Sequence, residues 1–155
     1  MPVDSSLKRR TFLQTLGTIG LVAPAISCRT VSPPPTGRLR HASFGAGGMA
    51  GLDIDMICSS EKVDLVAVAD VDLNRVSEVV EKYPGVRVYQ DWRDLLEKEE
   101  NNIDSVNVST PDHMHAPIAM AAMQRGKHAY CQKPLAHDIY DVRQLTDYAR
   151  KHGLV

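Results

Sequence analysis

The sequence predicts an α/β fold with a doubly wound parallel sheet. From about residue 38, short runs rich in β-branched residues alternate with longer runs of helical periodicity. The first such run ends in the glycine-rich turn Gly45-Ala46-Gly47-Gly48, and a helix is predicted to begin directly after it. Strands that alternate with helices form right-handed crossover units, and such units assemble into a parallel sheet.

The first three strand–helix units are predicted over residues 41–99. Strands are expected at His41–Phe44, Val63–Ala69 and Val86–Tyr89, and the helices that follow them at Met49–Ser59, Asn74–Lys82 and Trp92–Glu99. Val63–Ala69 is the clearest β run. Pro84-Gly85 stops the second helix, and Asp91 can cap the third because its carboxylate can accept from free backbone N–H groups.

The last two units are predicted over residues 105–153. Strands are expected at Ser105–Val108 and His128–Cys131, and helices at Ala116–Arg125 and Ile139–His152. Gly126 and Gly153 are placed to end these helices, and Asp138 to cap the second. Leu154-Val155 looks like the beginning of a sixth strand. We therefore expect one doubly wound domain over residues 38–155, truncated at that strand.

The N-terminal segment has the three-part layout of an export signal. Met1–Arg10 is short and basic, Thr11–Ser27 is uncharged and moderately apolar, and Ala25-Ile26-Ser27 offers small residues for a signal peptidase. The pair Arg9-Arg10, followed by Phe12-Leu13, resembles a twin-arginine signal. The apolar part is too short and polar for a transmembrane span. A signal peptide is predicted at residues 1–27, with export to the periplasm.

Residues 28–37 are predicted to form a linker because they contain three consecutive prolines. Cys28 follows directly after the predicted cleavage site, which leaves a lipid-anchored form open. The chain has three cysteines and none in a C-x-x-C arrangement, so neither a disulfide framework nor a metal site is expected. The formal net charge of -1 gives no indication of a nucleic-acid partner.

The turn after the first strand matches the phosphate-binding pattern G-x-G-x-x-G/A. Gly45 permits the tight turn, Gly47 lets the backbone approach a pyrophosphate, and Ala50 is small enough for helix and strand to touch. The helix that begins at Gly48-Met49 supplies N–H groups and a partial positive charge for the phosphates. A dinucleotide is the predicted ligand.

An acid at the end of the second strand indicates which dinucleotide. Asp70 is placed to accept hydrogen bonds from both adenosine ribose hydroxyls. Its charge would repel a 2′-phosphate, which favours NAD over NADP. Arg75 lies nearby and could pair with such a phosphate, so NADP stays open.

Two further loops follow the fourth and fifth strands, Ser109–His115 and Gln132–His137. Because ligands bind beyond the carboxyl ends of the strands in this fold, the loops are expected to face one crevice. They bring to it a lysine, three histidines and an acid. A lysine partly desolvated beside a bound cation can move a proton at neutral pH.

Together with the glycine turn, these loops resemble the glucose–fructose oxidoreductase and inositol dehydrogenase (Gfo/Idh/MocA) family. Thr110-Pro111 followed by His115 matches the family's loop after the fourth strand. Gln132-Lys133-Pro134 matches its Glu-Lys-Pro signature, with glutamine in place of glutamate. The resemblance runs from about Leu39 to Val155.

The resemblance implies roles for the matching residues. Lys133 would contact the substrate and assist proton transfer, and Pro134 would shape the nicotinamide pocket, often through a cis Lys–Pro bond. Gln132 would replace a glutamate that contacts the nicotinamide ribose. The remaining contacts with the cofactor would come from Ser109, Thr110, Pro111 and, near the nicotinamide, His115.

The resemblance also implies a function, an NAD-dependent oxidoreductase that transfers hydride to or from sugars or cyclitols. In the family a second domain supplies the substrate pocket and usually the oligomer interface, and we expect it to be absent from this sequence. Two alternatives stay open, an NAD-dependent glycosidase whose reaction is redox-neutral overall and a non-catalytic dinucleotide-binding fragment. The sequence names neither the substrate nor the oligomeric state, and a homo-oligomer is expected only of a full-length protein.

Overall fold

The computed structural model describes residues 37–155. The predicted signal peptide, Cys28 and almost all of the predicted linker lie outside the described residues. Within 37–155, no helix is both long enough and apolar enough to cross a membrane.

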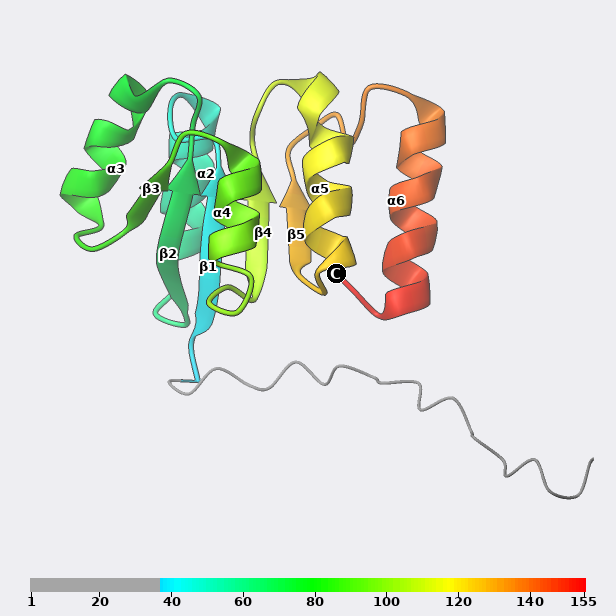
Figure 1. The fold of residues 1–155 in the computed structure, drawn as a ribbon, viewed down its shortest axis with the longest axis horizontal. Coiled ribbons are helices and arrows are strands. Elements are labelled where there is room, and N and C mark those ends of the chain that lie inside the picture. The colour runs from blue at the N-terminus through cyan, green and yellow to red at the C-terminus, as the bar shows by residue number, and fades with distance from the viewer. Residues whose placement is uncertain (1–36) are drawn as a thin grey trace, which may run out of the picture.

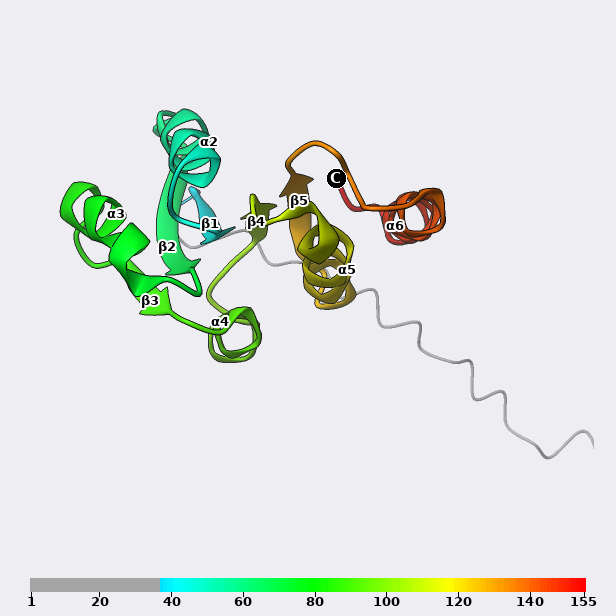
Figure 2. The ribbon, with the colours of Figure 1, turned by 90° about the horizontal axis from the view of Figure 1, so that it is seen from above.

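Within residues 37–155, five parallel strands form a single sheet (Figures 1 and 2). They are β1 (Leu39–Phe44), β2 (Val63–Ala69), β3 (Arg87–Tyr89), β4 (Ser105–Val108) and β5 (His128–Cys131). Their order across the sheet is β3-β2-β1-β4-β5. The chain therefore reverses direction across the sheet between β1 and β4, and a crevice at such a switch point is the usual ligand site of a doubly wound fold.

The helices cover both faces of this sheet. They are α2 (Met49–Cys58), α3 (Ser77–Lys82), α4 (Trp92–Lys98), α5 (His115–Gln124) and α6 (Ile139–His152), with 3-10 turns at Leu73–Val76 and Asp112–Met114. In Figure 2, α2 lies on one side of the strands and α4 and α5 lie on the other. Helix α6 packs beside α5. The predicted fold class is confirmed.

Most predicted elements are confirmed within one or two residues, and Val63–Ala69, Ser105–Val108, His128–Cys131 and Ile139–His152 have the predicted bounds. The predicted caps are present. The Asp91 carboxylate accepts from Arg93 N, the Asp138 carboxylate accepts from Asp141 N, and Gly153 has a left-handed backbone at the end of α6. Local side-chain chemistry therefore sets these helix ends.

Two elements differ from the prediction. Strand β1 begins at Leu39, because Asp104 at the start of β4 accepts from Arg40 N (2.9 Å), Nε and Nη2, which ties the first residues of β1 into the sheet. The predicted helix at 74–82 begins one residue earlier as a 3-10 turn, because the Asp72 carboxylate accepts from Asn74 N. The predicted sixth strand is represented by one backbone hydrogen bond, from Ala129 N to Val155 O at 2.8 Å.

Candidate functional site

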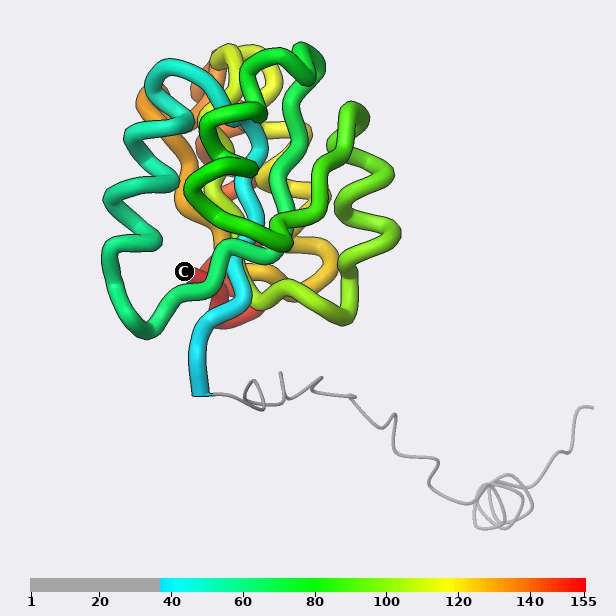
Figure 3. The backbone as a smooth tube through the Cα atoms, turned by 90° about the vertical axis from the view of Figure 1, so that its left-hand side faces the viewer, coloured from blue at the N-terminus to red at the C-terminus, as the bar shows by residue number. Residues whose placement is uncertain are grey.

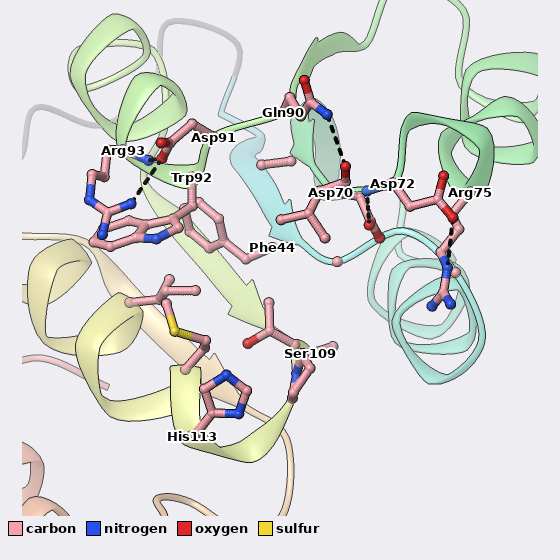
Figure 4. A pocket seen from close by; sticks show the side chains of 18 residues that line it. Phe44, Asp70, Asp72, Arg75, Gln90, Asp91, Trp92, Arg93, Ser109 and His113 are labelled. Carbon is pink, nitrogen blue, oxygen red and sulfur yellow. Dashed lines mark hydrogen bonds and ion pairs between the residues drawn. The ribbon is translucent and has the colours of Figure 1, made fainter.

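A cleft of about 840 Å³ lies at the carboxyl end of the sheet, at the switch point between β1 and β4. The turns that follow β1, β2 and β4 gather at this end of the molecule (Figure 3). Side chains from the turns and from the start of α4 surround the opening (Figure 4). The residues that line it include Phe44, Gly45, Gly47, Asp70, Asp72, Arg75, Gln90, Trp92, Ser109, Thr110, Pro111, His113, Met114 and Ile118.

The glycine turn forms one wall of the cleft. Gly45 has φ +101°, and a Cβ there would lie 2.8 Å from Ser109 O and 2.9 Å from the Ala50 Cβ. Gly48 has φ +58° and precedes α2, whose N terminus is not capped by any side chain among the described residues. The structure therefore requires glycine at both positions and leaves the N terminus of the helix open toward the turn.

Gly47 is a different case. A Cβ at this position would come within 3.0 Å of the Arg75 Cδ, the middle of a long and half-exposed side chain that can move. The fold itself therefore has no strong need for glycine there. The close approach of a pyrophosphate to Gly47 stays a prediction.

Asp70 lies at the end of β2 and faces the glycine turn. Its Oδ2 accepts from Ala46 N at 2.9 Å, and its Oδ1 accepts from Asp72 N at 3.0 Å. Two backbone N–H groups thus fix the carboxylate, and each oxygen keeps a lone pair for a further donor. Arg75, on the same side of the cleft as Asp70, forms a 3.5 Å ion pair with Asp72 (Figure 4).

The sequence prediction missed the apolar wall of the cleft. Trp92, Phe44, Met114 and Ile118 line it, and the guanidinium of Arg93 stacks on the Trp92 ring at 4.5 Å (Figure 4). Met114 lies in the predicted loop Ser109–His115, but Phe44, Trp92 and Ile118 belong to no motif, and only the tertiary fold brings the four side chains together. A flat aromatic ring beside an apolar floor suits a planar base.

The loop after β4 enters the cleft as predicted, since Ser109, Thr110 and Pro111 all line it. The Thr110 hydroxyl is buried without a hydrogen-bond partner among the described residues. A buried polar atom without a partner is costly to a fold unless a ligand satisfies it. Thr110 therefore marks a place where a hydrogen-bonding ligand fits.

His115 is almost completely buried, at 1% exposure, as the first residue of α5. Its Nε2 lies 2.8 Å from Thr110 O and its Nδ1 lies 2.7 Å from Pro134 O. The imidazole thus joins the two loops predicted to face the nicotinamide. Both ring nitrogens already have a protein partner, so His115 can act on a ligand only through the loops it holds.

The Lys133–Pro134 peptide bond is cis, as the resemblance implied. Lys133 is exposed, and the loop Gln132–Pro134 lies beside the cleft and not among its lining residues. The Gln132 amide points inward, where its Nε2 donates to the carboxylate of Asp53 on α2. Asp53 was not predicted as a site residue. The proposed contact of Gln132 with a ribose stays a prediction.

The ionisable groups around the site have distinct states. Burial lowers the pKa of His41, which lies on β1 against Ser105 and Asn107 of β4, to about 4, so this imidazole is neutral at neutral pH. Burial also raises the pKa of Cys131 to about 11, so its thiol is not a nucleophile there. Residues 37–155 contain no cluster of side chains able to hold a metal ion.

Comparison with known proteins shows a match to a protein family. Residues 39–155 match a family described as an oxidoreductase family with an NAD-binding Rossmann fold, GFO_IDH_MocA. The match covers the whole sheet and both loops that carry the predicted signature.

Among curated proteins, the chain is 30% identical over 174 aligned residues to an alpha-N-acetylgalactosaminidase of Shewanella oneidensis and to a glycosyl hydrolase family 109 protein of a Shewanella species. Each alignment covers 94% of this chain and 38% of the relative. An uncharacterized oxidoreductase of Rhizobium meliloti is 31% identical over 114 residues, which cover 71% of this chain and 34% of the relative. The chain thus spans little more than a third of the curated relatives it matches.

Solved structures share the fold. GenD2 from gentamicin A biosynthesis, in complex with NAD, has a TM-score of 0.69 at 30% identity, over 76% of this chain and 33% of its own. Biliverdin reductase from Synechocystis, in complex with biliverdin and NADP+, has a TM-score of 0.68 at 27% identity, over 76% of this chain and 36% of its own. Both carry a dinucleotide.

Proposed function

The chain belongs to the Gfo/Idh/MocA oxidoreductase family with its NAD-binding Rossmann fold, and on that premise we propose that it supplies the cofactor site of an enzyme that transfers hydride to or from sugars or cyclitols. The observation that carries the proposal is the Asp70 carboxylate, which backbone N–H groups of Ala46 and Asp72 hold at the rim of the cleft. It is placed to accept from the hydroxyls of a ribose.

The described residues fit NAD at several points. The apolar wall around Trp92 suits the adenine, and Asp70 suits the adenosine ribose. The open N terminus of α2 at Gly48 and Met49 suits the pyrophosphate. The Thr110 hydroxyl has a free hydrogen-bonding capacity in the same wall. The negative charge of Asp70 favours NAD, while Arg75 on the rim is the group that would receive the phosphate of NADP.

Lys133 is the residue we propose for proton transfer. Its loop is joined by His115 to Thr110 in the cleft wall, so the lysine is held close to the cofactor site. NAD supplies the hydride acceptor for the carbon that is oxidised. Lys133 takes the proton of the substrate hydroxyl, directly or through a relay, and returns it in the reverse direction.

A substrate screen with the protein purified from its native source tests this function. Mixing it with NAD and a panel of sugars and cyclitols should produce NADH in proportion to product, and Lys133→Met should abolish this turnover while NADH binding persists. Turnover that survives Lys133→Met would refute the role of the lysine. Binding without turnover on any substrate would identify a non-catalytic dinucleotide-binding protein.

A glycosidase is the second candidate, because several of the curated relatives are glycosidases by name. In this reaction a sugar is oxidised, the aglycone is eliminated, water is added and the sugar is reduced again, so NAD is not consumed overall. The test uses nitrophenyl glycosides, including the α-N-acetylgalactosaminide. Release of nitrophenol without net NADH supports the glycosidase, and stoichiometric NADH supports the dehydrogenase.

We also propose that residues 1–27 direct export by the twin-arginine route. The basic start, the uncharged stretch and the small residues Ala25 and Ser27 support it. Cell fractionation and the intact mass of the protein test the proposal. Arg9→Lys with Arg10→Lys should hold an uncleaved precursor in the cytoplasm, and an added mass on Cys28 would show a lipid anchor.

A further inference from the structure

A buried carboxylate lies behind the site, on the first turns of α2. Asp53 is 6% exposed, and its partners are neutral donors. Its Oδ2 accepts from Ser109 Oγ at 2.6 Å, and Gln132 Nε2 donates to Oδ1 and Oδ2 at 3.2 and 3.0 Å. No cation among the described residues forms an ion pair with it. One carboxylate therefore joins the cleft loop after β4 to the lysine loop after β5.

This contact reaches the backbone of Lys133. The Gln132 Oε1 accepts from Lys133 N at 2.8 Å, so the side chain bridges Asp53 and the lysine's own N–H group. On the next residue, Pro134 O lies 2.7 Å from His115 Nδ1. The lysine loop is thus held at two consecutive residues, from α2 through Asp53 and from α5 through His115.

The hydrogen-bond network continues from Asp53 into the sheet, and all of its donors point the same way. Asn107 Nδ2 donates to Ser109 Oγ at 3.0 Å, and Asn107 Oδ1 lies 3.0 Å from His41 Nε2. Because that oxygen can only accept, the neutral imidazole of His41 donates from Nε2. Each member donates toward Asp53, where the chain ends on the negative charge. Hydrogen bonds aligned in this way polarise one another and stabilise the buried Asp53 carboxylate.

The pairing depends on an amide at position 132. A glutamate there would place a second carboxylate about 3 Å from Asp53, and two buried like charges at this distance cannot both ionise. The Gln132 amide removes that conflict and donates to the acid. In this pair the carboxylate therefore comes from Asp53 on α2, and the amide comes from Gln132 on the loop after β5.

We propose that Asp53 is a positioning residue, which orients the Lys133 loop against the cleft through Gln132 and Ser109. The inference rests on the proposed function, because it concerns the geometry of the lysine relative to a bound cofactor. Asp53 itself is buried and is not among the residues that line the cleft. Its effect should be confined to the nicotinamide end, since the adenosine end is held separately by Asp70.

An exchange of the acid and the amide tests the inference. The variants are Gln132→Glu, Asp53→Asn and the double variant Asp53→Asn with Gln132→Glu, and Gln144→Glu, on the exposed side of α6, is the matched control for added charge. Each protein is titrated with NADH. The enhancement of NADH fluorescence reports the nicotinamide end, and a parallel titration with ADP-ribose, which lacks the nicotinamide, reports the adenosine end through quenching of Trp92, the single tryptophan.

At pH 8, like-charge repulsion in Gln132→Glu should displace the loop. The apparent affinity for NADH, measured by nicotinamide fluorescence, should then fall by about tenfold. The signal should recover as the pH falls, because a proton shared by the two carboxyls restores a donor. The double variant should regain the wild-type signal at all pH values. Trp92 quenching should persist throughout, and Gln144→Glu should match the wild type.

Two results overturn the inference separately. If Gln132→Glu keeps the wild-type nicotinamide signal and pH profile, or if the double variant is no better than Gln132→Glu, Asp53 does not position the loop. If the unchanged protein shows neither signal, the proposed function fails and the inference with it. If a variant loses both signals, circular dichroism shows whether it is still folded. A folded variant without Trp92 quenching would contradict the prediction that Asp53 affects only the nicotinamide end.

Discussion

The carboxylate of Asp70, at the end of β2, accepts a hydrogen bond of 2.9 Å from the backbone N–H of Ala46, inside the glycine turn after β1. The two parts of the predicted nucleotide motif are therefore in direct contact before any ligand binds. The second oxygen accepts from Asp72 N at 3.0 Å, so the acid is fixed from both sides. A preorganised acceptor of this kind loses little entropy when a ribose binds.

Asp70→Asn should weaken the binding of NADH at least tenfold, because hydrogen bonds to a charged acceptor contribute about 1.5–3 kcal/mol. Binding of NADPH should weaken less, since the substitution also removes the repulsion of the 2′-phosphate. Quenching of Trp92 measures both affinities, and Asp147→Asn on the exposed side of α6 is the control. An unchanged ratio of NADH to NADPH affinity would show that Asp70 does not meet the ribose.

Gly45→Ala should destabilise the domain by about 3 kcal/mol, from a left-handed backbone and a Cβ that meets Ser109 O at 2.8 Å. Gly85→Ala is the matched control, because Gly85 has φ +93° but open space around its Cβ position. Gly85→Ala should lower the free energy of unfolding by about 1 kcal/mol, because only its left-handed backbone is strained. Urea unfolding measures both, and equal losses would contradict the close packing of turn and loop.

Stability should fall as the pH is lowered from 7 to 5, because of His41. Its pKa in the fold is lowered to about 4 by burial, so the unfolded chain takes up the proton first and is favoured in this window. The loss should be about 2 kcal/mol. His41→Gln should flatten this part of the profile. His137→Gln, at an exposed position, should leave it in place, and a profile insensitive to His41→Gln would contradict the buried neutral imidazole.

Glu99 should stabilise the fold above pH 5. Hydrogen bonds from Arg87, and then from Tyr89 and Asn102, outweigh burial and lower the pKa of this carboxyl to about 2. Its contribution is therefore present above the unfolded pKa and is lost as the pH falls toward 2. Glu99→Gln should cost about 2 kcal/mol at pH 7 in urea unfolding. The exposed Glu97→Gln should cost almost nothing, and an equal loss from both would contradict the network.

Local patterns in the sequence were enough to predict the fold class and most element bounds. The run Val63–Ala69, the cap Asp138 and the stop Gly153 are decided by residues next to each other in the chain, and all three are confirmed. The glycine turn and Asp70 form a local motif with fixed spacing, and the structure brings them together.

Contacts between distant segments could not be predicted. Asp53 and Gln132 are 79 residues apart, and an aspartate in the first turns of a helix ordinarily faces water. Trp92 enters the cleft because α4 begins just after the carboxyl end of β3 and lies on the same face of the sheet as α5 (Figure 2), and no spacing in the sequence indicates it. His115 was placed near the nicotinamide, and the structure shows that both of its ring nitrogens face backbone carbonyls.

Calorimetric titration of the purified protein with NADH measures directly whether this domain binds NAD in the cleft beside Asp70. We expect saturable binding at one site per chain, weaker binding of NADPH, and a large loss of affinity in Asp70→Asn. A protein that is folded by circular dichroism and yet gives no saturable heat with millimolar NADH would contradict it.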